Sequence, residues 1–262
     1  MENISEKMPI AFLGHGNPMN AIEKNSFTES LRKFGAKLPK LKAILMISAH
    51  WETNGTYVTG MERPRTIHDF GNFPRALFEV QYPAPGAPEI AKDLTHEVSD
   101  PIIQIDLNKW GLDHGTWSVL KHIFPQANIP VFQLSLDRTK PMEYHFEMGK
   151  KISYLRDHGV MIMGSGNIVH NLREVNWDPE AKPYDWAIEF DQWVKDKLEK
   201  RDYKSLFKEA LSSKEGKLSI PTLEHYLPIL YVLGASSDSD KLLHEFEGID
   251  MSSMSMRCFS LS

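Results

Sequence analysis

Short runs of consecutive apolar residues recur along the chain, and their spacing limits the folds open to it. The runs cover residues 9–13, 43–48, 102–105, 130–136 and 160–163. A last strand is expected in "SMSMRCFSL", near the C-terminus. Because these runs are continuous rather than alternating, they predict strands of a sheet that is covered on both faces.

Helical patterns separate the apolar runs and cover residues 20–34, 88–98, 142–159 and 184–211. Gly159 is expected to end the third of them, and Thr222 to cap a further helix that Pro228 interrupts. Strands that alternate with helices favour an open, mostly parallel sheet. We therefore predict one α/β domain over 1–262, with a mostly parallel central sheet flanked by helices and an active site at the C-terminal edge of the strands.

Composition excludes several classes of partner and location. The net charge of -5 argues against nucleic acid or an anionic membrane surface as the main partner. No apolar stretch approaches the roughly 18 residues of a membrane span, and "MENISEKMPIAF" carries no signal peptide pattern. The single cysteine, Cys258, fits a reducing cytoplasm. The helix expected over 184–200 faces either solvent or a second copy, which leaves a homo-oligomer open.

Histidines follow three of the predicted strands. His15 comes after "IAFLG", His50 after "ILMISA", and His170 shortly after "VMIMGSGNIV". If the sheet is parallel, these imidazoles meet at one edge, where ligands of α/β sheets bind. Glycines at 14, 16, 164 and 166 allow sharp turns and close approach to a ligand. With His225 as a fourth candidate, the set suits one divalent ion such as Zn, Fe or Cu.

The alternative for any single histidine is a structural or solvated role. The spacing 15, 50, 170 and 225 matches no compact metal motif, so the repeated context of strand, small residue and histidine carries the argument. Other histidines lie in helical or charged contexts and are expected to be structural or solvated: His96, His122, His145, His158 and His244.

The segment "WGLDHGTWSVL" places His114 next to Asp113, just before a predicted helix. His114 is a candidate acid, base or substrate contact; alternatively, Asp113 caps the helix and His114 is incidental. The long loops over 61–86, with "TIHDFGNFP", are candidate walls of a site.

These segments together resemble the class III extradiol ring-cleavage dioxygenases, in particular their 4,5-DOPA branch. The resemblance covers nearly the whole chain and is carried by "FLGHGNPMNA", "ISAHWET", "TIHDFGNFP", "YPAPG", "DHGTWSVL", "VFQLSL", "GSGNIVHNLR" and "PTLEHYLPILYVLGA". Membership would imply an α/β domain with a non-haem metal at one edge of its sheet.

Carried over by position, the resemblance assigns His15, His50 and His225 to the metal. It makes His170 the acid/base beside the ion, and a metal ligand too if its ring reaches that far. His114 would line the substrate pocket. Glu224 competes with His225 as a ligand, but adjacent helical residues point about 100° apart, so only one of the two is expected to bind; the branch favours His225.

The implied reaction opens a catechol, such as L-DOPA, with O2 and Fe(II), and yields a muconic semialdehyde. His170 would take a hydroxyl proton, and His114 would either stabilise oxygen intermediates or donate the proton that assists O–O cleavage. Zn(II) is a plausible bound ion, because four nitrogens hold it well. Candidate contacts for the amino-acid end of DOPA are Arg173, Asp69 and Glu52.

Two alternatives stand beside this function. One is a non-catalytic metal-binding protein on the same scaffold, against which the presence of both His170 and His114 argues. The other is a zinc hydrolase with His170 as base, for which Glu224 is the one ambiguous acidic candidate in the segments considered.

Overall fold

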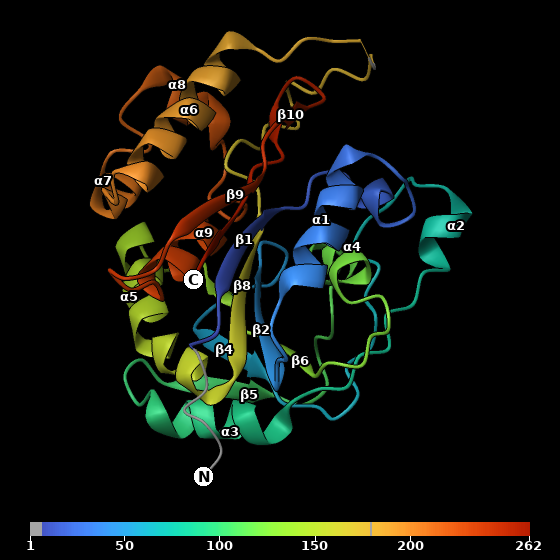
Figure 1. The fold of residues 1–262 in the computed structure, drawn as a ribbon, viewed down its shortest axis with the longest axis vertical. Coiled ribbons are helices and arrows are strands. Elements are labelled where there is room, and N and C mark those ends of the chain that lie inside the picture. Colours follow the sequence, from blue (N-terminus) through green and yellow to red (C-terminus); the bar gives the residue numbers. More distant parts are fainter. Residues whose placement is uncertain (1–6, 179) are drawn as a thin grey trace.

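A six-stranded sheet forms the centre of the molecule (Figure 1). The computed structural model describes residues 7–178 and 180–262. In sheet order the strands are β6 (Val131–Gln133), β2 (Ala43–Ser48), β8 (Val160–Gly166), β1 (Ile10–Gly14), β12 (Cys258–Leu261) and β9 (Leu242–Phe246). The first four run parallel to one another, and β12 and β9 run antiparallel to their neighbours. The predicted mostly parallel α/β sheet is confirmed.

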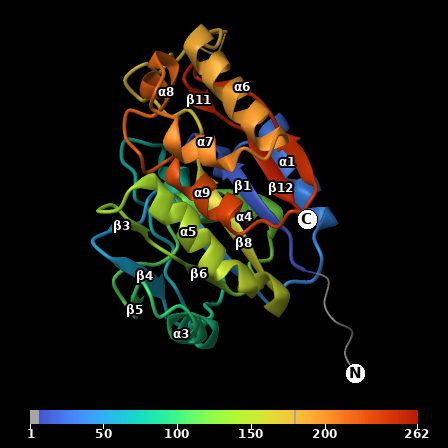
Figure 2. The ribbon, with the colours of Figure 1, turned by 90° about the vertical axis from the view of Figure 1, so that its left-hand side faces the viewer.

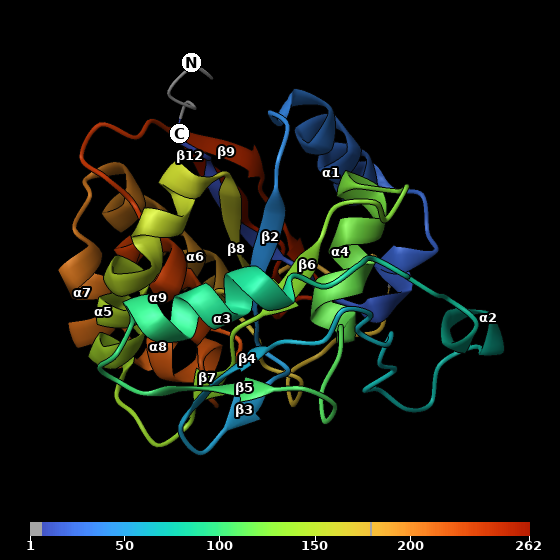
Figure 3. The ribbon, with the colours of Figure 1, turned by 90° about the horizontal axis from the view of Figure 1, so that it is seen from below.

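Side chains of each central strand alternate between two hydrophobic cores. In β2, Leu45 and Ile47 face one core, while Ile44 and Met46 face the other. The first core is covered by α5 (Met142–Ile152) and α9 (Leu227–Gly234), which lie side by side in Figure 2. The second is covered by α1 (Ser26–Lys37) and α4 (His114–Ile123), on the opposite side of the sheet in Figure 3. Burial on both faces explains why the strands are apolar without alternation.

The helix predicted over 20–34 is instead a 3₁₀ turn, η1 (Pro18–Ala21), followed by α1. The break lies at Asn25, whose side-chain oxygen accepts from the Thr28 backbone N–H, while the Thr28 hydroxyl accepts from the Asn25 backbone N–H. This capping box starts a new helix within the apolar pattern.

The other helices lie close to their predicted places. α3 (Pro88–Glu97) is confirmed, and α6 (Asp185–Glu199) with α7 (Tyr203–Lys208) forms the expected pair. α5 continues into η2 (Ser153–His158), which ends at Gly159 with a left-handed φ of 82°. Two short helices, α2 (Arg75–Phe78) and α8 (Lys214–Ser219), complete the set in the described residues. Among the helices of residues 7–178 and 180–262, none is both long and apolar enough to cross a membrane.

The helix near residue 225 begins later than predicted. α9 starts at Leu227 and holds Pro228 in its first turn, where no backbone N–H is needed for an intrahelical bond. Thr222 is therefore not its cap, and Pro228 does not interrupt it. His225 precedes the helix in a turn.

Two strand predictions are also corrected. The run 102–105 forms β5 (Ile103–Asp106), which pairs with β4 (Thr56–Thr59) outside the main sheet, at the end that α3 covers (Figure 3). Ile102 remains 77% exposed. The run 130–136 is divided between β6 and β7 (Leu136–Asp137). The remaining short strands are β3 (Glu52–Thr53), paired with β7, and the hairpin of β10 (Ile249–Asp250) and β11 (Met254–Ser255).

Candidate metal centre

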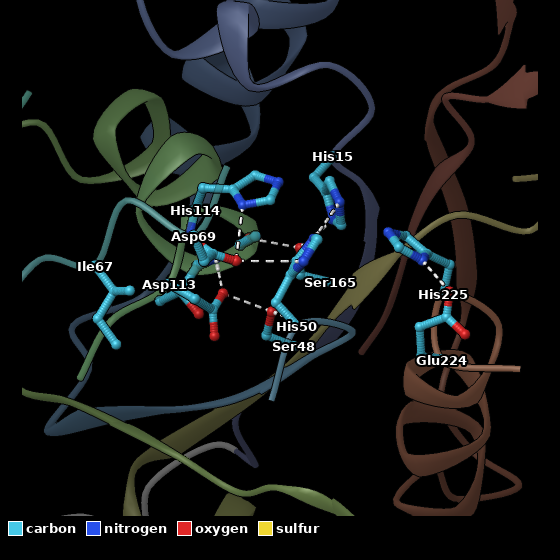
Figure 4. A network of polar contacts seen from close by, with 12 residues as sticks. His15, Ser48, His50, Ile67, Asp69, Asp113, His114, Ser165, Glu224 and His225 are labelled. Atoms are coloured by element: carbon cyan, nitrogen blue, oxygen red, sulfur yellow. Dashed lines mark hydrogen bonds and ion pairs between the residues drawn. The ribbon is translucent and has the colours of Figure 1, made fainter. Parts of the chain in front are cut away.

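Histidines from five separate segments converge at the carboxyl ends of the parallel strands. They follow β1, β2 and β8, begin α4, and precede α9: His15, His50, His170, His114 and His225. The ring centroids of His15 and His50 lie 5.0 Å apart, and those of His50 and His225 5.1 Å apart. Figure 4 shows the rings of His15, His50, His114 and His225 gathered about one centre. The structure thus brings together all the histidines singled out in the sequence.

The ring of His15 is held in one orientation by β8. The Ser165 hydroxyl donates to the Gly115 carbonyl at 2.6 Å and lies 3.0 Å from His15 Nδ1. Since the hydroxyl proton is committed to the carbonyl, the Ser165 oxygen accepts the proton of His15 Nδ1. The lone pair of His15 Nε2 is then free to bind a metal.

One carboxylate orients two more rings. Asp69 Oδ2 lies 3.0 Å from His114 Nδ1 and 3.3 Å from His50 Nδ1, and Asp69 Oδ1 accepts the His114 backbone N–H at 2.8 Å. The Nε2 atoms of His50 and His114 therefore carry the free lone pairs. Asp69 was expected to contact the substrate; the structure places it behind the histidines.

Glu224 and His225 divide their roles in the same way. The Glu224 carboxylate accepts the Thr222 hydroxyl at 2.8 Å and lies 3.0 Å from His225 Nδ1. This contact leaves His225 Nε2 free and gives Glu224 the supporting place that carboxylates take behind metal-binding histidines. It also leaves Glu224 poorly placed as the free base that a zinc hydrolase would need.

His170 stacks on His225, with ring centroids 3.5 Å apart and an interplanar angle of 11°. Its backbone N–H is bound by the Ser219 carbonyl, and a bridge to Met254 of the hairpin fixes the same residue from the other side. Within the described ranges, no protein group is hydrogen-bonded to its ring nitrogens. His170 is thus firmly positioned with a free imidazole.

Burial keeps these imidazoles neutral. Burial, together with neighbouring histidines, lowers the pKa of His15 and of His225 well below the ordinary value. Burial lowers the pKa of His50 to about 3 and that of His170 to about 4. Burial acts to raise the pKa of Asp69, but its contacts with His114 and His50 outweigh that and lower it. Neutral rings beside an ionised carboxylate suit the binding of a cation.

The donor set fits a divalent metal ion. His15 Nε2 and His50 Nε2 are 3.1 Å apart with both lone pairs free, an arrangement that is repulsive unless a cation lies between them. The separation suits two metal–nitrogen bonds of about 2.0–2.1 Å. Donor atoms of His15, His50 and His114 lie within 4.8 Å of one another, and those of His170, Glu224 and His225 form an adjacent group. The donor distances therefore group His114 with His15 and His50, while the ring centroid of His225 lies 5.4 Å from that of His15 and 5.1 Å from that of His50.

Asp113 and its neighbour Gly115 set α4 against the site. Asp113 caps α4, and its carboxylate accepts from Ser48 at 2.6 Å and from Gln133 at 2.7 Å. A Cβ on Gly115 would lie 2.9 Å from the His50 ring and 2.6 Å from the Ser48 hydroxyl. A capping role for Asp113 and a place for His114 in the site were offered as alternatives, but both hold. The cap at Asp113 starts α4 so that His114 points into the site.

Glycines of β8 act differently from the prediction. They were expected to let the backbone approach a ligand, but a Cβ on Gly166 would lie 2.1 Å from the His225 carbonyl, and one on Gly164 would lie 2.6 Å from the Pro228 carbonyl. These glycines let the first turn of α9 and the residue His225 before it lie directly on β8. They place His225 rather than a substrate.

A cavity of about 280 Å³ opens beside all five histidines. From the loops over 61–86, Phe70 and Phe73 reach its lining. Neither Arg173 nor Glu52, the other predicted substrate contacts, is among its lining residues. Its size is close to the lower end, about 300 Å³, of small-molecule sites, which suits a ligand with one ring.

The histidines expected to be structural lie apart from this centre. His122 Nε2 lies 2.7 Å from the Asn20 carbonyl, and His145 Nδ1 lies 3.0 Å from the Tyr231 hydroxyl. His244 lies 3.5 Å from both Glu199 and Glu247. The contacts of Ser165 and Asp69 with the ring nitrogens of the site histidines were not predicted from the sequence. Both residues lie within the motifs "GSGNIVHNLR" and "TIHDFGNFP".

Comparison with known proteins gives consistent matches over nearly the whole chain. Residues 9–256 match a family described as the catalytic LigB subunit of aromatic ring-opening dioxygenase. A relative from Escherichia coli K12, named 4,5-DOPA dioxygenase extradiol, is 48% identical over 254 residues, which are 96% of this chain and 94% of the relative. A relative of the same name from Beta vulgaris is 37% identical over 255 residues, 93% of this chain and 92% of the relative.

A solved structure is also similar. The crystal structure of an uncharacterized protein from Escherichia coli K12 matches with a TM-score of 0.85 and 44% sequence identity. The match covers 97% of this chain and 100% of that one.

Proposed function

The chain belongs to the LigB family of aromatic ring-opening dioxygenases, and on that premise we propose that it opens a catechol ring with O2 in a reaction that depends on one divalent metal ion. The observation that supports this most is the set of free Nε2 lone pairs, each with its Nδ1 against an oxygen, beside one cavity. The names of the relatives make L-DOPA the first catechol to test.

We assign His15, His50 and His225 as the metal ligands. A bound Fe(II) would supply Lewis acidity and open positions where a catechol and O2 meet. His170 lies face to face with His225 and is assigned two roles: the base for a catechol hydroxyl during turnover and, with its ring turned out of this stack, a fourth ligand in the resting protein. Zn(II), held by four nitrogens, would suit the resting form.

His170 is expected to return that proton to the product. His114 is assigned a second proton, which it takes from the other catechol hydroxyl and donates to assist O–O cleavage. Its Nε2 is free, and the Asp69 carboxylate against its Nδ1 would stabilise the imidazolium that forms when Nε2 takes up a proton. In the overall reaction both atoms of O2 enter the product and one carbon–carbon bond beside the diol breaks, giving a muconic semialdehyde. The apolar lining of the cavity would exclude water from this exchange.

Reconstitution tests the function directly. Metal-free protein is loaded with Fe(II) without oxygen, mixed with L-DOPA and other simple catechols, and then exposed to air. We expect O2 uptake equal to the catechol consumed, with a yellow product. The zinc-loaded protein should consume no O2. A fully iron-loaded protein that opens none of the catechols would contradict the proposal.

Metal content tests the third ligand. We expect His15→Ala, His50→Ala and His225→Ala to lose most of the bound metal, as measured by elemental analysis after dialysis, and His114→Ala to keep the metal while losing turnover. If His225→Ala kept its metal and His114→Ala lost it, the third ligand would be His114, which the donor distances group with His15 and His50.

A further inference from the structure

The cavity beside the histidines has an apolar wall. Side chains of the loop before α2, of the segment after β8 and of the β10–β11 hairpin form it: Phe70, Phe73, Leu172, Val175, Trp177 and Met251. Leu172 is 63% exposed and Trp177 73% exposed. Large apolar side chains exposed together at a cavity leave surface that a ligand's apolar group can cover.

The described lining of the cavity is uncharged apart from any charge on its histidines. Among the described residues that line the cavity, none is Asp, Glu, Lys or Arg. Arg173 follows Leu172 in sequence but does not line it. The nearby carboxylates and the Asn17 carbonyl are already engaged: the Asn17 side-chain oxygen accepts from the Met19 backbone, and Asp69 and Glu224 contact histidines. The uncharged Asn17 amide N–H group is the polar donor that remains in the described lining.

Among the residues that the structure describes, an amino-acid substituent would therefore meet no charged partner here. The ammonium and carboxylate of L-DOPA would lose water against this wall without gaining an ion pair, which is unfavourable. An alkyl substituent of the same length would gain from the same burial. The catechol ring itself contacts the histidines in either case.

Resting on the proposed function, we infer that this site selects catechols whose ring substituent is uncharged and apolar, in preference to amino-acid catechols such as L-DOPA. The diol end of the ligand is recognised by the metal centre, and the substituent by Phe70, Leu172, Val175 and Trp177. L-DOPA remains a substrate, but a poor one.

A matched pair of substrates tests the inference. 4-Propylcatechol has the three-carbon substituent of L-DOPA without its two charges, and dihydroxyphenylpropionate carries the carboxylate alone. With iron-loaded protein we expect kcat/KM to be at least about 10-fold higher for 4-propylcatechol than for L-DOPA, with the propionate in between. Titration calorimetry without oxygen should rank the dissociation constants in the same order.

The possible failures are distinguishable. Equal or higher kcat/KM for L-DOPA, with tighter anaerobic binding, would overturn the selectivity while leaving the proposed function in place. No O2 uptake with any of these catechols would overturn the proposed function and the selectivity together.

A charge added to the wall gives an independent test. Leu172→Arg places a cation at an exposed lining position and should raise kcat/KM for the propionate relative to 4-propylcatechol about 10-fold. The matched control is Ile102→Arg, at a 77% exposed position that precedes β5 and does not line the cavity. The control should leave that ratio unchanged. The same ratio in both variants, with both folded by circular dichroism, would contradict the assignment of this wall.

Discussion

At the residue scale, the site depends on oxygens behind the histidines as much as on the histidines themselves. Asp69 is the clearest case, because one of its oxygens serves both His50, assigned to the metal, and His114, assigned to proton transfer. Its other oxygen binds the first backbone N–H of α4. A change at Asp69 therefore reaches both functions of the site at once.

Asp69→Asn is expected to weaken metal binding about 10–100-fold and to lower kcat by a similar factor. The amide keeps the size of the side chain but removes the charge that orients two Nδ1–H groups. Competition with a chelator measures the first effect, and steady-state kinetics on metal-saturated protein measures the second. Asp137→Asn, at a buried aspartate that binds Thr139, is the control and should change neither. Unaltered metal affinity in Asp69→Asn would contradict the orienting role.

Sequence could predict the histidines but not these supporting contacts. His15 and His50 follow recognisable strands, so the parallel sheet alone brings them to one edge. Asp69 lies in a loop, and no sequence pattern near it indicates that this loop contacts α4. Asp69 was therefore predicted to contact the substrate. The neighbours Glu224 and His225 were seen as competitors, because only the fold shows that the Glu224 carboxylate contacts Nδ1 of His225 and leaves Nε2 free.

At the scale of elements, the continuous apolar strands of the main sheet were predictable, because a strand that is buried on both faces needs apolar side chains at successive positions. β2 matches its predicted bounds of 43–48. β5 was predictable as a strand but not as a member of a separate two-stranded sheet, since pairing partners are set by tertiary contacts. The start of α9 was misplaced because Thr222 resembles a cap, while the fold uses Pro228 in the first turn.

A buried ion pair ties three elements together. Arg156 of η2 is fully buried; its guanidinium binds both oxygens of Asp240, the Met8 carbonyl before β1 and the Ala235 carbonyl after α9. Asp240→Ala should lower the free energy of unfolding by about 3–5 kcal/mol, because it leaves a buried charge without its partner. Urea denaturation followed by circular dichroism measures this loss.

The control is an exposed pair of the same chemistry. Arg75 and Glu79 lie 2.8 Å apart with side chains 92% and 62% exposed. Glu79→Ala should lower the free energy of unfolding by less than about 1 kcal/mol. Equal losses in Asp240→Ala and Glu79→Ala would show that the buried pair does not join these elements.

The packing of α5 on α9 makes stability depend on pH. Burial of His145 beside Tyr231 lowers the pKa of His145 from 6.5 to about 4. The unfolded chain therefore takes up this proton at a higher pH than the folded chain, so the free energy of unfolding falls as pH drops from 6.5 towards 4. His145 contributes up to roughly 3 kcal/mol to this fall.

His145→Gln should make the acid-side decline shallower. Urea unfolding gives the free energy of unfolding of each protein at pH 8 and at pH 5. The difference between the two pH values is compared, so a loss of packing that is the same at both does not affect the result. Parallel declines in the wild type and the variant would contradict the role of His145.

At the scale of the whole molecule, the proposed ligands come from segments far apart in the chain. His15 follows β1, His50 follows β2, and His225 precedes α9, so one ion would join both halves of the sequence across the sheet. The unfolded chain has no such arrangement of nitrogens. Metal binding is therefore expected to stabilise the entire fold rather than one loop.

Thermal unfolding with and without metal tests this coupling. At a free metal concentration of about 100 times the Kd, binding adds about 2.7 kcal/mol, which for a chain of this size raises Tm by roughly 5–10 °C. Chelation should reverse the rise. His15→Ala should remove it, because the Nε2 that faces His50 is lost, whereas His158→Ala, at an exposed histidine of η2, should retain it in full. A metal-dependent rise that survives in His15→Ala would place the ion elsewhere in the molecule.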